Sequence, residues 1–479
     1  MASTSTSSDT IFALSSAAGR AGVAVIRISG RKAAAAMEAL AGPLPSPRKA
    51  ALRRVKDPSS GDLIDRSLVI WFPSPATFTG EDIAEFQVHG GRAVIAGLLA
   101  TLGSLPGCRL AEPGEFALRA FENGKLDLAQ AEGLADLIDA ETEAQRRQAL
   151  HQAGGALSNQ TGIWRASLVE AMSLVEAAID FSDEADVLES SVAQAEQRIT
   201  ALSAKIADQL DDGHRGEILR DGFKVVLAGA PNVGKSSLFN ALARRDVAIV
   251  SAEAGTTRDT IEVRLDLNGL PVIVTDTAGL RDATGEIEQE GIRRTLARSK
   301  DANLVLWVID ANSLEIAEPV PRELEGKTIV VANKCDLAPP SFPRLAEGKP
   351  LNWSREPKQA ADGTPAEVCL APGHRRDDEL IQLSAKTGIG LDTLIKTIAA
   401  EAAKSTGGTQ AEGVITQARH RRHLTDCQEH LQSFLARTSD IELRAEDLRL
   451  AADSLGRITG RIDPEDVLDQ VFGRFCIGK

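Results

Sequence analysis

The stretch Gly229-Ala-Pro-Asn-Val-Gly-Lys-Ser236 decides the fold of the middle of this chain. It follows the apolar run 223–228 and precedes 237–242, a segment of helical character. A glycine-rich turn between a strand and a helix, with the spacing GxxxxGK[ST], predicts a phosphate-binding loop. Backbone N–H groups then converge on an anion at the start of a helix, where the helix dipole also favours negative charge. Lys235 would face the β- and γ-phosphates, and the Ser236 hydroxyl would bind Mg²⁺.

The residues around this loop, about 222–404, alternate apolar runs with helical segments. The expected strands are 223–229, 261–267, 270–275, 303–309, 327–332 and 380–383. Asn268-Gly269 predicts a type I′ hairpin turn between two of them. The remaining alternation predicts an α/β domain with a mainly parallel sheet. Residues 339–378, rich in Pro, Lys, Arg and Gly, predict a long surface insertion.

Four further motifs follow the phosphate loop, and three of them stand at the ends of expected strands, where open α/β sheets bind ligands. They are Gly255-Thr-Thr-Arg-Asp259, Asp276-Thr-Ala-Gly279, Asn333-Lys-Cys-Asp336 and Ser384-Ala-Lys386. The Asp336 carboxylate can only accept hydrogen bonds, which suits N1–H and N2–H of guanine and not the N1 acceptor of adenine. The sequence therefore predicts a GTP site. The expected GTP-binding residues are Asn232, Val233, Gly234, Lys235, Ser236, Ser237, Ser251, Gly255, Thr256, Thr257, Asp276, Thr277, Ala278, Gly279, Asn333, Lys334, Asp336, Ser384, Ala385 and Lys386.

The usual glutamine that orients the attacking water is absent, because Leu280 follows the motif at 276–279. Hydrolysis is therefore slow, or another group performs this role. Asn232, with backbone carbonyls of 251–256, could bind a monovalent cation that neutralises charge in the transition state. Three glutamates, 286, 288 and 290, follow and could orient the water. From the residues alone, they could equally form a solvated acidic first turn of a helix.

The rest of the chain predicts two further domains. Up to about residue 122, strands at 22–29, 67–72 and 82–89 with helices at 31–40 and 93–102 indicate a compact α+β domain. From Lys125 to about Leu219, and again over the last ~70 residues, apolar residues recur at helical spacing. We therefore expect an α+β domain at 1–123, a helical domain split into 124–220 and 405–479, and an inserted nucleotide-binding domain at 221–404.

Composition limits the class of protein and its partners. The net charge of −14 argues against a generally basic nucleic-acid binder. The five scattered cysteines form no CxxC motif, so reduced thiols and a cytoplasmic location are expected. No apolar run is long enough to span a bilayer, and residues 1–10 do not resemble a secretory signal.

Over essentially its full length the chain resembles the MnmE/TrmE family of tRNA-modifying GTPases, within the TrmE-Era-Der-like superfamily. Besides the GTPase motifs, the resemblance rests on Val25-Ile-Arg-Ile-Ser-Gly30, Phe78-Thr-Gly-Glu-Asp82, Pro113-Gly-Glu-Phe116, Arg119-Ala-Phe121, Lys125-Leu-Asp-Leu-Ala-Gln-Ala-Glu132, Ala135-Asp-Leu-Ile-Asp139 and the terminal Phe475-Cys-Ile-Gly-Lys479. One stretch departs from the family's Thr-Pro-Pro before Gly-Arg-Gly, because this chain has Ser16-Ala-Ala18 and then Gly19-Arg-Ala21.

The resemblance implies a cytoplasmic homodimer with an N-terminal tetrahydrofolate-binding domain, a split helical domain and an inserted Ras-like GTPase domain. It implies hydrolysis stimulated by potassium as the GTPase domains pair. With an FAD-dependent partner, MnmG, such proteins add an aminomethyl or carboxymethylaminomethyl group at C5 of the wobble uridine of certain tRNAs. A 5-formyl- or 5,10-methylene-tetrahydrofolate supplies the carbon. A GTP-dependent RNA-binding switch or ribosome-assembly factor is the alternative, because a GTPase domain alone cannot separate the two.

The resemblance also assigns roles to single residues. Ser236 and Thr257 match Mg²⁺ ligands, and the potassium site corresponds to Asn232, Ser251, Glu253 and Thr256. Glu288 matches the catalytic, water-orienting glutamate, beside Lys235 of the phosphate loop. The folate-binding positions correspond to Arg27, Glu85, Lys125 and Lys479.

Two cysteine-containing features remain open. Cys476, next to the terminal motif, could serve as a nucleophile or a one-carbon attachment point, or could be a small buried residue. His423, Cys427 and His430 share one face of an expected helix, but a metal site would need a fourth ligand. Arg421 and Arg422 beside them favour a solvated face.

Overall fold

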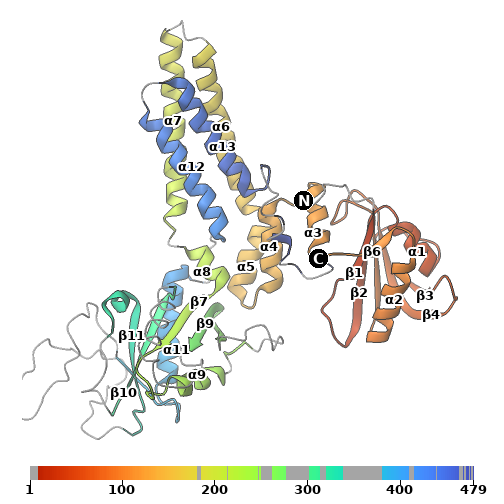
Figure 1. Ribbon diagram of the computed structural model, residues 1–479, viewed down its shortest axis with the longest axis horizontal. Helices are drawn as coiled ribbons and strands as arrows, with labels where there is room; N and C mark the ends of the chain where they lie inside the picture. The colour runs from red at the N-terminus through yellow and green to blue at the C-terminus, as the bar shows by residue number, and fades with distance from the viewer. Residues whose placement is uncertain are drawn as a thin grey trace, which may run out of the picture. The chain divides into compact units, whose positions relative to one another are not determined.

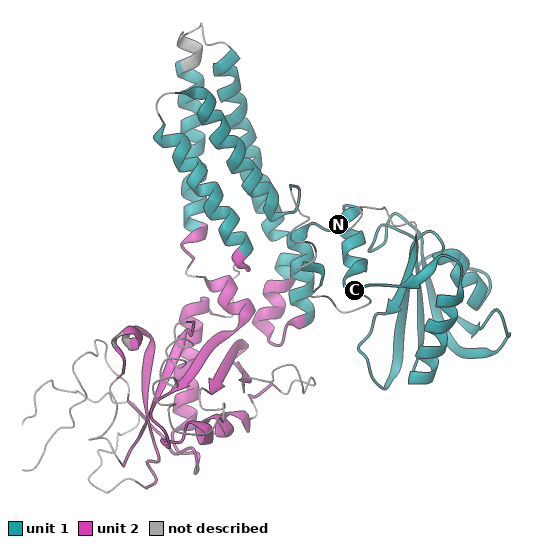
Figure 2. Cartoon of the chain, viewed as in Figure 1, with its two compact units in different colours: residues 1–138, 150–208, 419–479 teal, residues 139–149, 209–418 magenta. Residues whose placement is uncertain are grey.

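The computed structural model describes the chain in two compact units (Figure 2). Unit 1 comprises Met1–Ile138, Leu150–Asp208 and Arg419–Lys479, and unit 2 comprises Asp139–Ala149 and Gln209–Ala418. The described residues are 9–180, 185–212, 214–245, 247–249, 262–276, 301–312, 320–337, 380–408, 415–437, 440–462, 468, 471–473, 475 and 478. The expected insertion at 339–378 lies outside them. In these ranges, no helix has the length and apolar character needed to cross a membrane.

The N-terminal part of unit 1 is a sheet with two helices on one face (Figure 1). Within the described residues its strands are β1 (Thr10–Leu14), β2 (Ala21–Ser29), β3 (Ala51–Lys56), β4 (Leu63–Phe72), β5 (Ile83–Gly90) and β6 (Cys108–Leu110). They lie in the order β3-β4-β5-β2-β1-β6, with β1 and β6 parallel and the other neighbours antiparallel. The helices are α1 (Ala33–Ala41) and α2 (Arg92–Ser104). The expected strands correspond to β2, β4 and β5, whereas β1, β3 and β6 were not predicted.

The alternation of side chains along β2 explains which face is buried. Ala24, Ile26 and Ile28 point into a core shared with Met37 of α1 and Leu98 of α2. The residues between them point to the opposite face of the sheet. On that face Arg27 lies directly across from Glu85 of β5, so two of the four residues with an expected folate role project from the same side of the sheet.

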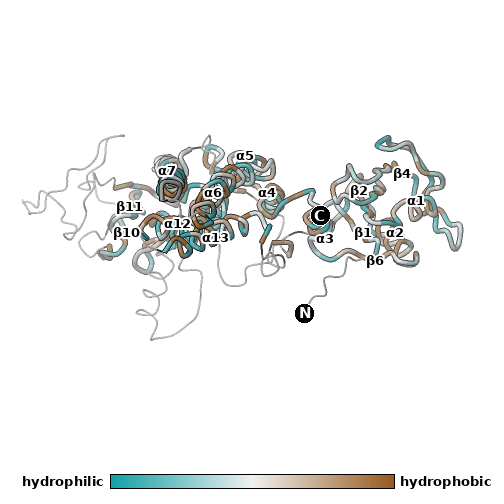
Figure 3. Tube along the Cα trace, turned by 90° about the horizontal axis from the view of Figure 1, so that it is seen from above, coloured by the Kyte–Doolittle hydropathy of each residue, from teal (hydrophilic) through white to brown (hydrophobic). Residues whose placement is uncertain are grey.

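The remainder of unit 1 is helical. Among the described residues the helices are α3 (Glu115–Glu122), α4 (Leu128–Asp139), α5 (Glu143–Ala153), α6 (Ala156–Asp180), α7 (Ala185–Leu210), α12 (Ala418–Ala436) and α13 (Ile441–Ile458), with α4, α5, α7 and α12 extending into unit 2. Figure 1 shows α6, α7, α12 and α13 side by side. Along α6, Leu157, Trp164 and Leu168 are buried at helical spacing. Figure 3 shows the same four helices carrying both hydrophobic and hydrophilic residues, as expected for amphipathic helices that share a core.

Unit 2 has the α/β architecture that the sequence predicts. Its described elements are α8 (Arg215–Asp221), β7 (Phe223–Ala228), α9 (Lys235–Ala243), β8 (Glu262–Leu267), β9 (Leu270–Asp276), β10 (Leu304–Asp310), the 3₁₀-helix η2 (Arg322–Lys327), β11 (Thr328–Asn333), β12 (Ile381–Gln382) and α11 (Leu391–Thr406). The sheet order is β12-β11-β10-β7-β9-β8, parallel except for the β8–β9 hairpin. Asn268 and Gly269 at its turn have φ of 58° and 85°, which agrees with the predicted type I′ turn.

Residues 139–149 pack as part of unit 2, although they comprise the end of α4 and the first part of α5. Ala144 is buried within the core of the α/β sheet, and its N–H donates to Gly269 O at 3.2 Å. Gln148 Nε2 donates to Gly216 O at 2.8 Å, and Arg264 Nη1 lies 2.9 Å from Glu141 Oε2. This short segment is therefore bonded to both the β8–β9 hairpin and α8.

Candidate functional site

The phosphate loop joins β7 to α9, and close contacts explain both of its glycines. Gly229 and Gly234 have φ of 129° and 95°, a region that side chains rarely adopt. A Cβ on Gly229 would lie 2.2 Å from Val308 O, and one on Gly234 would lie 2.3 Å from Asn333 Nδ2. The glycines are therefore required by the end of β10 and by the start of the guanine motif, as well as by the turn itself.

The two polar residues that begin α9 are held in place by the loop and by β9. Lys235 Nζ donates to Gly229 O and Ala230 O, each at 2.8 Å, so its ammonium lies inside the loop. Ser236 Oγ donates to Asp276 Oδ2 at 3.0 Å. Asp276 is buried at the end of β9. A hydroxyl and a carboxylate oxygen at this separation form a donor set that suits Mg²⁺.

The guanine motif is bonded directly to the phosphate loop through Asn333. Its Nδ2 donates to Val233 O at 3.0 Å, and its Oδ1 accepts from the N–H groups of Lys334 at 2.8 Å and Ala385 at 3.0 Å. One buried amide therefore holds together three of the predicted motifs. Asp336 and Lys386 are exposed beside it, where they can reach a base.

Lys334 extends this network to the end of β10. Its Nζ donates to Asn232 O at 2.8 Å and to Asp310 Oδ2 at 2.7 Å. Burial would raise the pKa of Asp310, but the hydrogen bonds from Lys334 and Asn312 outweigh it and leave the pKa below its usual value. Asp310 was not among the residues predicted to bind GTP. The available signal was its position at the carboxyl end of a central strand.

Several predicted residues lie outside the described part of the chain. They are Ser251, Glu253, Gly255, Thr256, Thr257, Thr277, Ala278, Gly279, Glu288, Cys476 and Lys479. The structure does bring together Asn232, Val233, Gly234, Lys235, Ser236, Asp276, Asn333, Lys334, Ser384 and Ala385. Ser237, Asp336 and Lys386 lie on the same loops and on the start of α9.

A second group of predicted residues lies on the N-terminal sheet. Arg27 Nε donates to Glu85 Oε1 at 2.9 Å, and both side chains are partly exposed. The Arg27 guanidinium lies 5.8 Å from the ring centre of Phe78 and 6.0 Å from that of Phe116. Lys125 is exposed, and its stem lies beside Gly80 in the loop that carries Phe78. Arg27 and Glu85 are thus brought into direct contact, with Lys125 beside the neighbouring loop.

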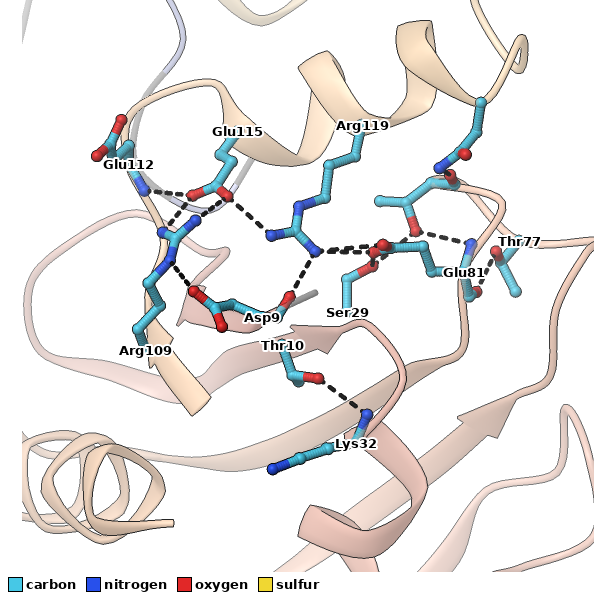
Figure 4. Close-up of polar contacts among 12 residues, drawn as sticks. Asp9, Thr10, Ser29, Lys32, Thr77, Glu81, Arg109, Glu112, Glu115 and Arg119 are labelled. Carbon is cyan, nitrogen blue, oxygen red and sulfur yellow. Dashed lines mark hydrogen bonds and ion pairs between the residues drawn. The ribbon is translucent and has the colours of Figure 1, made fainter. Parts of the chain in front are cut away.

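The family motifs around this pair converge on one charged network (Figure 4). Arg109 donates to both Glu115 oxygens, at 2.8 and 2.6 Å. Arg119 donates to Glu115 at 2.9 Å and to Glu81 at 3.2 Å, and Ser29 Oγ donates to Glu81 at 2.7 Å. Burial opposes ionisation of Glu115, yet the two arginines keep its pKa below the usual value. The network fixes the loop and the helix that carry Phe78 and Phe116.

The terminal motif also approaches this domain. Ser15 Oγ donates to Gly478 O at 2.8 Å. Phe472 and Phe475 are buried with Ala117 of α3 and Leu128 of α4. Sequence reasoning named the motif but gave no partner for it.

The expectation of a solvated face at His423 and Cys427 is wrong. Both side chains are buried on α12, whereas the neighbouring Arg421 is half-buried and Arg422 is exposed. Burial and nearby arginines lower the pKa of His423 to about 4, and burial raises the pKa of Cys427 to about 12. Within the described residues, no group of three or more His, Cys, Asp or Glu could hold a metal ion.

Together, the phosphate loop, the Asp276 carboxylate and the guanine motif define a class: this is a GTP-hydrolysing P-loop enzyme with additional domains before and after its nucleotide-binding unit. Two family models match the chain, the GTP-binding protein TrmE N-terminus over residues 10–125 and the MnmE helical domain over residues 128–476. The chain therefore belongs to the MnmE (TrmE) family.

Individual relatives agree. The tRNA modification GTPase MnmE of Parvibaculum lavamentivorans is 50% identical over 481 residues, covering 98% of this chain and 100% of its own length. The protein of the same name from Rhodopseudomonas palustris is 47% identical over 474 residues, covering 99% of each chain. Among solved structures, the G domain of the T. maritima FeoB iron transporter is 29% identical and covers 38% of this chain and 98% of its own. The TM-score of this match is 0.22.

Proposed function

We propose that this GTPase drives modification of the wobble uridine of certain tRNAs. With an FAD-dependent partner similar to MnmG, it adds an aminomethyl or carboxymethylaminomethyl group at C5, using carbon from 5-formyl- or 5,10-methylene-tetrahydrofolate. The observation that carries the proposal is the coexistence, in one full-length member of the family, of the bonded GTP site and the Arg27–Glu85 pair. Because tRNA is the substrate, we propose that the protein acts in the cytoplasm.

The described groups around the phosphate loop are chemically suited to two cations. Ser236 and Asp276 would hold Mg²⁺, with Thr257 as a further ligand. Asn232 would contribute to a potassium site with Ser251, Glu253 and Thr256. Its backbone has φ of 63°, and its carbonyl is held by Lys334. A bound cation would supply positive charge near the phosphates, while Glu288 would orient the attacking water.

The N-terminal residues suit a folate. A guanidinium can bind the carboxylates of a glutamate tail, and a carboxylate can accept hydrogen bonds from a pterin. Arg27 and Glu85 offer one of each on the sheet, and the rings of Phe78 and Phe116 lie 5.8 and 6.0 Å from the guanidinium. Lys125 and Lys479 would add positive charge for the tail.

A homodimer is supported by the uncovered face of the same sheet. Leu52 and Leu68 are directly opposite each other on β3 and β4, and 68% and 41% of their surfaces are exposed. Val23 on β2 is exposed as well. Apolar side chains gathered on one face of a sheet commonly mark an interface, and a second copy of the chain would cover them.

The test is mass analysis of the wobble uridine in tRNA from cells that lack this protein and are complemented with variants. Wild type and Lys404→Ala, a matched change of an exposed lysine on α11, should restore the C5 group. Lys235→Ala should abolish both GTP hydrolysis and modification, because it removes the cation of the phosphate loop.

Purified protein should also hydrolyse GTP faster in K⁺ than in Na⁺, and equal rates would contradict the potassium site. Modification without hydrolysis would overturn the proposed coupling. If cells that lack the protein still carry the C5 group at wild-type levels and show a ribosome-assembly defect, the result would favour the alternative of a GTP-dependent RNA-binding switch.

A further inference from the structure

Asp310 occupies the one strand end that lies between the two halves of the nucleotide site. In the described sheet, β10 is flanked by β7, which leads into the phosphate loop, and by β11, which leads into the guanine motif. Asp310 is the last residue of β10 and is directly across from Asn333. A side chain here can therefore influence both loops.

The Asp310 carboxylate is held in a defined orientation. Its Oδ1 accepts from the backbone N–H of Asn312 at 2.9 Å and from Asn312 Nδ2 at 3.0 Å. Its Oδ2 accepts from Lys334 Nζ at 2.7 Å, and 20% of the carboxylate side chain and 33% of the lysine side chain are exposed. An oriented and partly buried charge pair of this kind is stronger than a typical surface ion pair.

The same ammonium ties the guanine motif to the phosphate loop. Lys334 Nζ also donates to Asn232 O at 2.8 Å. Lys334 and Asn232 both have left-handed backbones, with φ of 65° and 63°. Such conformations cost free energy in residues other than glycine and persist only where neighbouring contacts hold them. The hydrogen bonds of Lys334 connect these two strained residues to each other.

We propose that Asp310 is a positioning residue of the GTPase: by orienting Lys334, it fixes the guanine-recognition loop at 333–336 and the backbone of Asn232 at the phosphate loop. Guanine-nucleotide affinity therefore depends on a carboxylate that belongs to neither motif. The second consequence, an influence on the potassium response through Asn232, rests on the proposed function.

The test is the affinity of the full-length protein for a fluorescent GDP, measured for a double-mutant cycle. Asp310→Asn keeps the shape and removes the charge, and it should weaken GDP binding roughly tenfold, as expected for the loss of one charge-assisted hydrogen bond. In a Lys334→Met background the same change should alter affinity less than about twofold, because the group through which Asp310 acts is gone.

The matched control is Glu401→Gln, which removes the carboxylate of another lysine ion pair in unit 2, that with Lys404 on α11. It should leave GDP affinity unchanged. Asn312→Ala provides a milder variant, since it keeps the Asp310 charge and removes one of the donors that orient it. It should weaken GDP binding by a smaller factor than Asp310→Asn.

Wild-type affinity in Asp310→Asn, or an equal loss with and without Lys334, would overturn the proposal. In the hydrolysis assay, Asp310→Asn should raise the K⁺ concentration for half-maximal rate at least about threefold, whereas a merely structural loss of folded protein would lower the rate at every K⁺ concentration equally. If wild type does not respond to K⁺, the potassium site is refuted, and the GDP cycle alone decides the role of Asp310.

Discussion

The amide side chain of Asn333 forms hydrogen bonds with backbone groups of three loops. It accepts from Lys334 and Ala385 and donates to Val233. Only a group with both acceptor and donor atoms can do this, since an aspartate would present two acceptors to Val233 O. The sequence predicted Asn333 as part of a guanine motif, but nothing local indicates that its partner lies 100 residues earlier.

The close approach of Asn333 makes Gly234 a sensitive residue of the phosphate loop. Gly234→Ala would place a Cβ 2.3 Å from Asn333 Nδ2 at a φ of 95°. We expect GDP binding to be lost and the free energy of unfolding to fall by at least ~2 kcal/mol, because the clash and the backbone strain add. Fluorescent-nucleotide titration and urea denaturation measure the two effects.

The matched control for this variant is Gly326→Ala. Gly326 lies in η2, and an added Cβ would meet no atom within 4 Å. It should retain wild-type affinity and stability. Normal GDP binding in Gly234→Ala would show that the two loops can separate without loss of the site.

At the scale of elements, a buried cluster of polar and charged side chains connects α12 to α4. Arg419 donates to both oxygens of Glu132, at 3.0 and 2.8 Å, and His420 Nε2 lies 2.7 Å from the same carboxylate. Arg419 also donates to the carbonyls of Arg457 and Ile458 at the end of α13. Three helices that are distant in sequence therefore meet at Glu132, which is 1% exposed.

Removing this carboxylate should destabilise unit 1 strongly. Glu132→Gln leaves the Arg419 guanidinium without its counter-charge in a buried position, a change that typically costs about 3–5 kcal/mol. Denaturant unfolding followed by circular dichroism measures it. Glu170→Gln is the control, because it removes an exposed ion pair between α6 and α7 and should change stability little.

Glu132 should also give unit 1 a characteristic acid dependence. Burial would raise the pKa of Glu132, but His420 and Arg419 outweigh it and lower the pKa to about 2. A depressed pKa contributes stability that is complete above the unfolded value of ~4.3 and is lost as pH falls toward 2. Wild type should therefore lose stability over this range more steeply than Glu132→Gln, and parallel pH profiles would contradict the assignment.

The elements that the sequence predicted are those with a strong local signal. β2 alternates, β10 is a continuous apolar run, and the turn at Asn268-Gly269 requires positive φ at both residues. β1, β3 and β6 are short or exposed strands whose place is decided by partners far along the chain. The prediction of a solvated face at His423 and Cys427 failed for a similar reason: neighbouring arginines in sequence do not show which face of α12 is buried.

At the scale of the whole molecule, the last described residues pack against α3 and α4, which lie more than 300 residues earlier. Phe472 and Phe475 join a cluster with residues of α3 and α4. A Cβ on Gly114 would lie 2.1 Å from Phe472 O, which shows how closely this segment packs against the start of α3. Gly478 accepts a hydrogen bond from Ser15, 463 residues earlier. This packing of the terminal segment against the start of the chain could not be predicted from sequence, because the motif at 475–479 has no partner nearby in the sequence.

This closure predicts that the end of the chain controls modification and not nucleotide binding. A Cβ on Gly478 would lie 2.2 Å from Leu14 O at a φ of 103°, whereas Gly61, with φ of 80°, has open space around it. Gly61→Ala therefore imposes the backbone strain alone, and Gly478→Ala adds the clash. We expect Gly478→Ala to reduce wobble-uridine modification at least about fivefold while GDP affinity stays within about twofold, because every described contact of Gly478 lies in unit 1. Mass analysis of tRNA and nucleotide titration measure the two effects.

Equal loss of both activities would show that the terminal segment supports the GTP site as well. Normal modification would show that its docking beside Leu14 and Ser15 is dispensable.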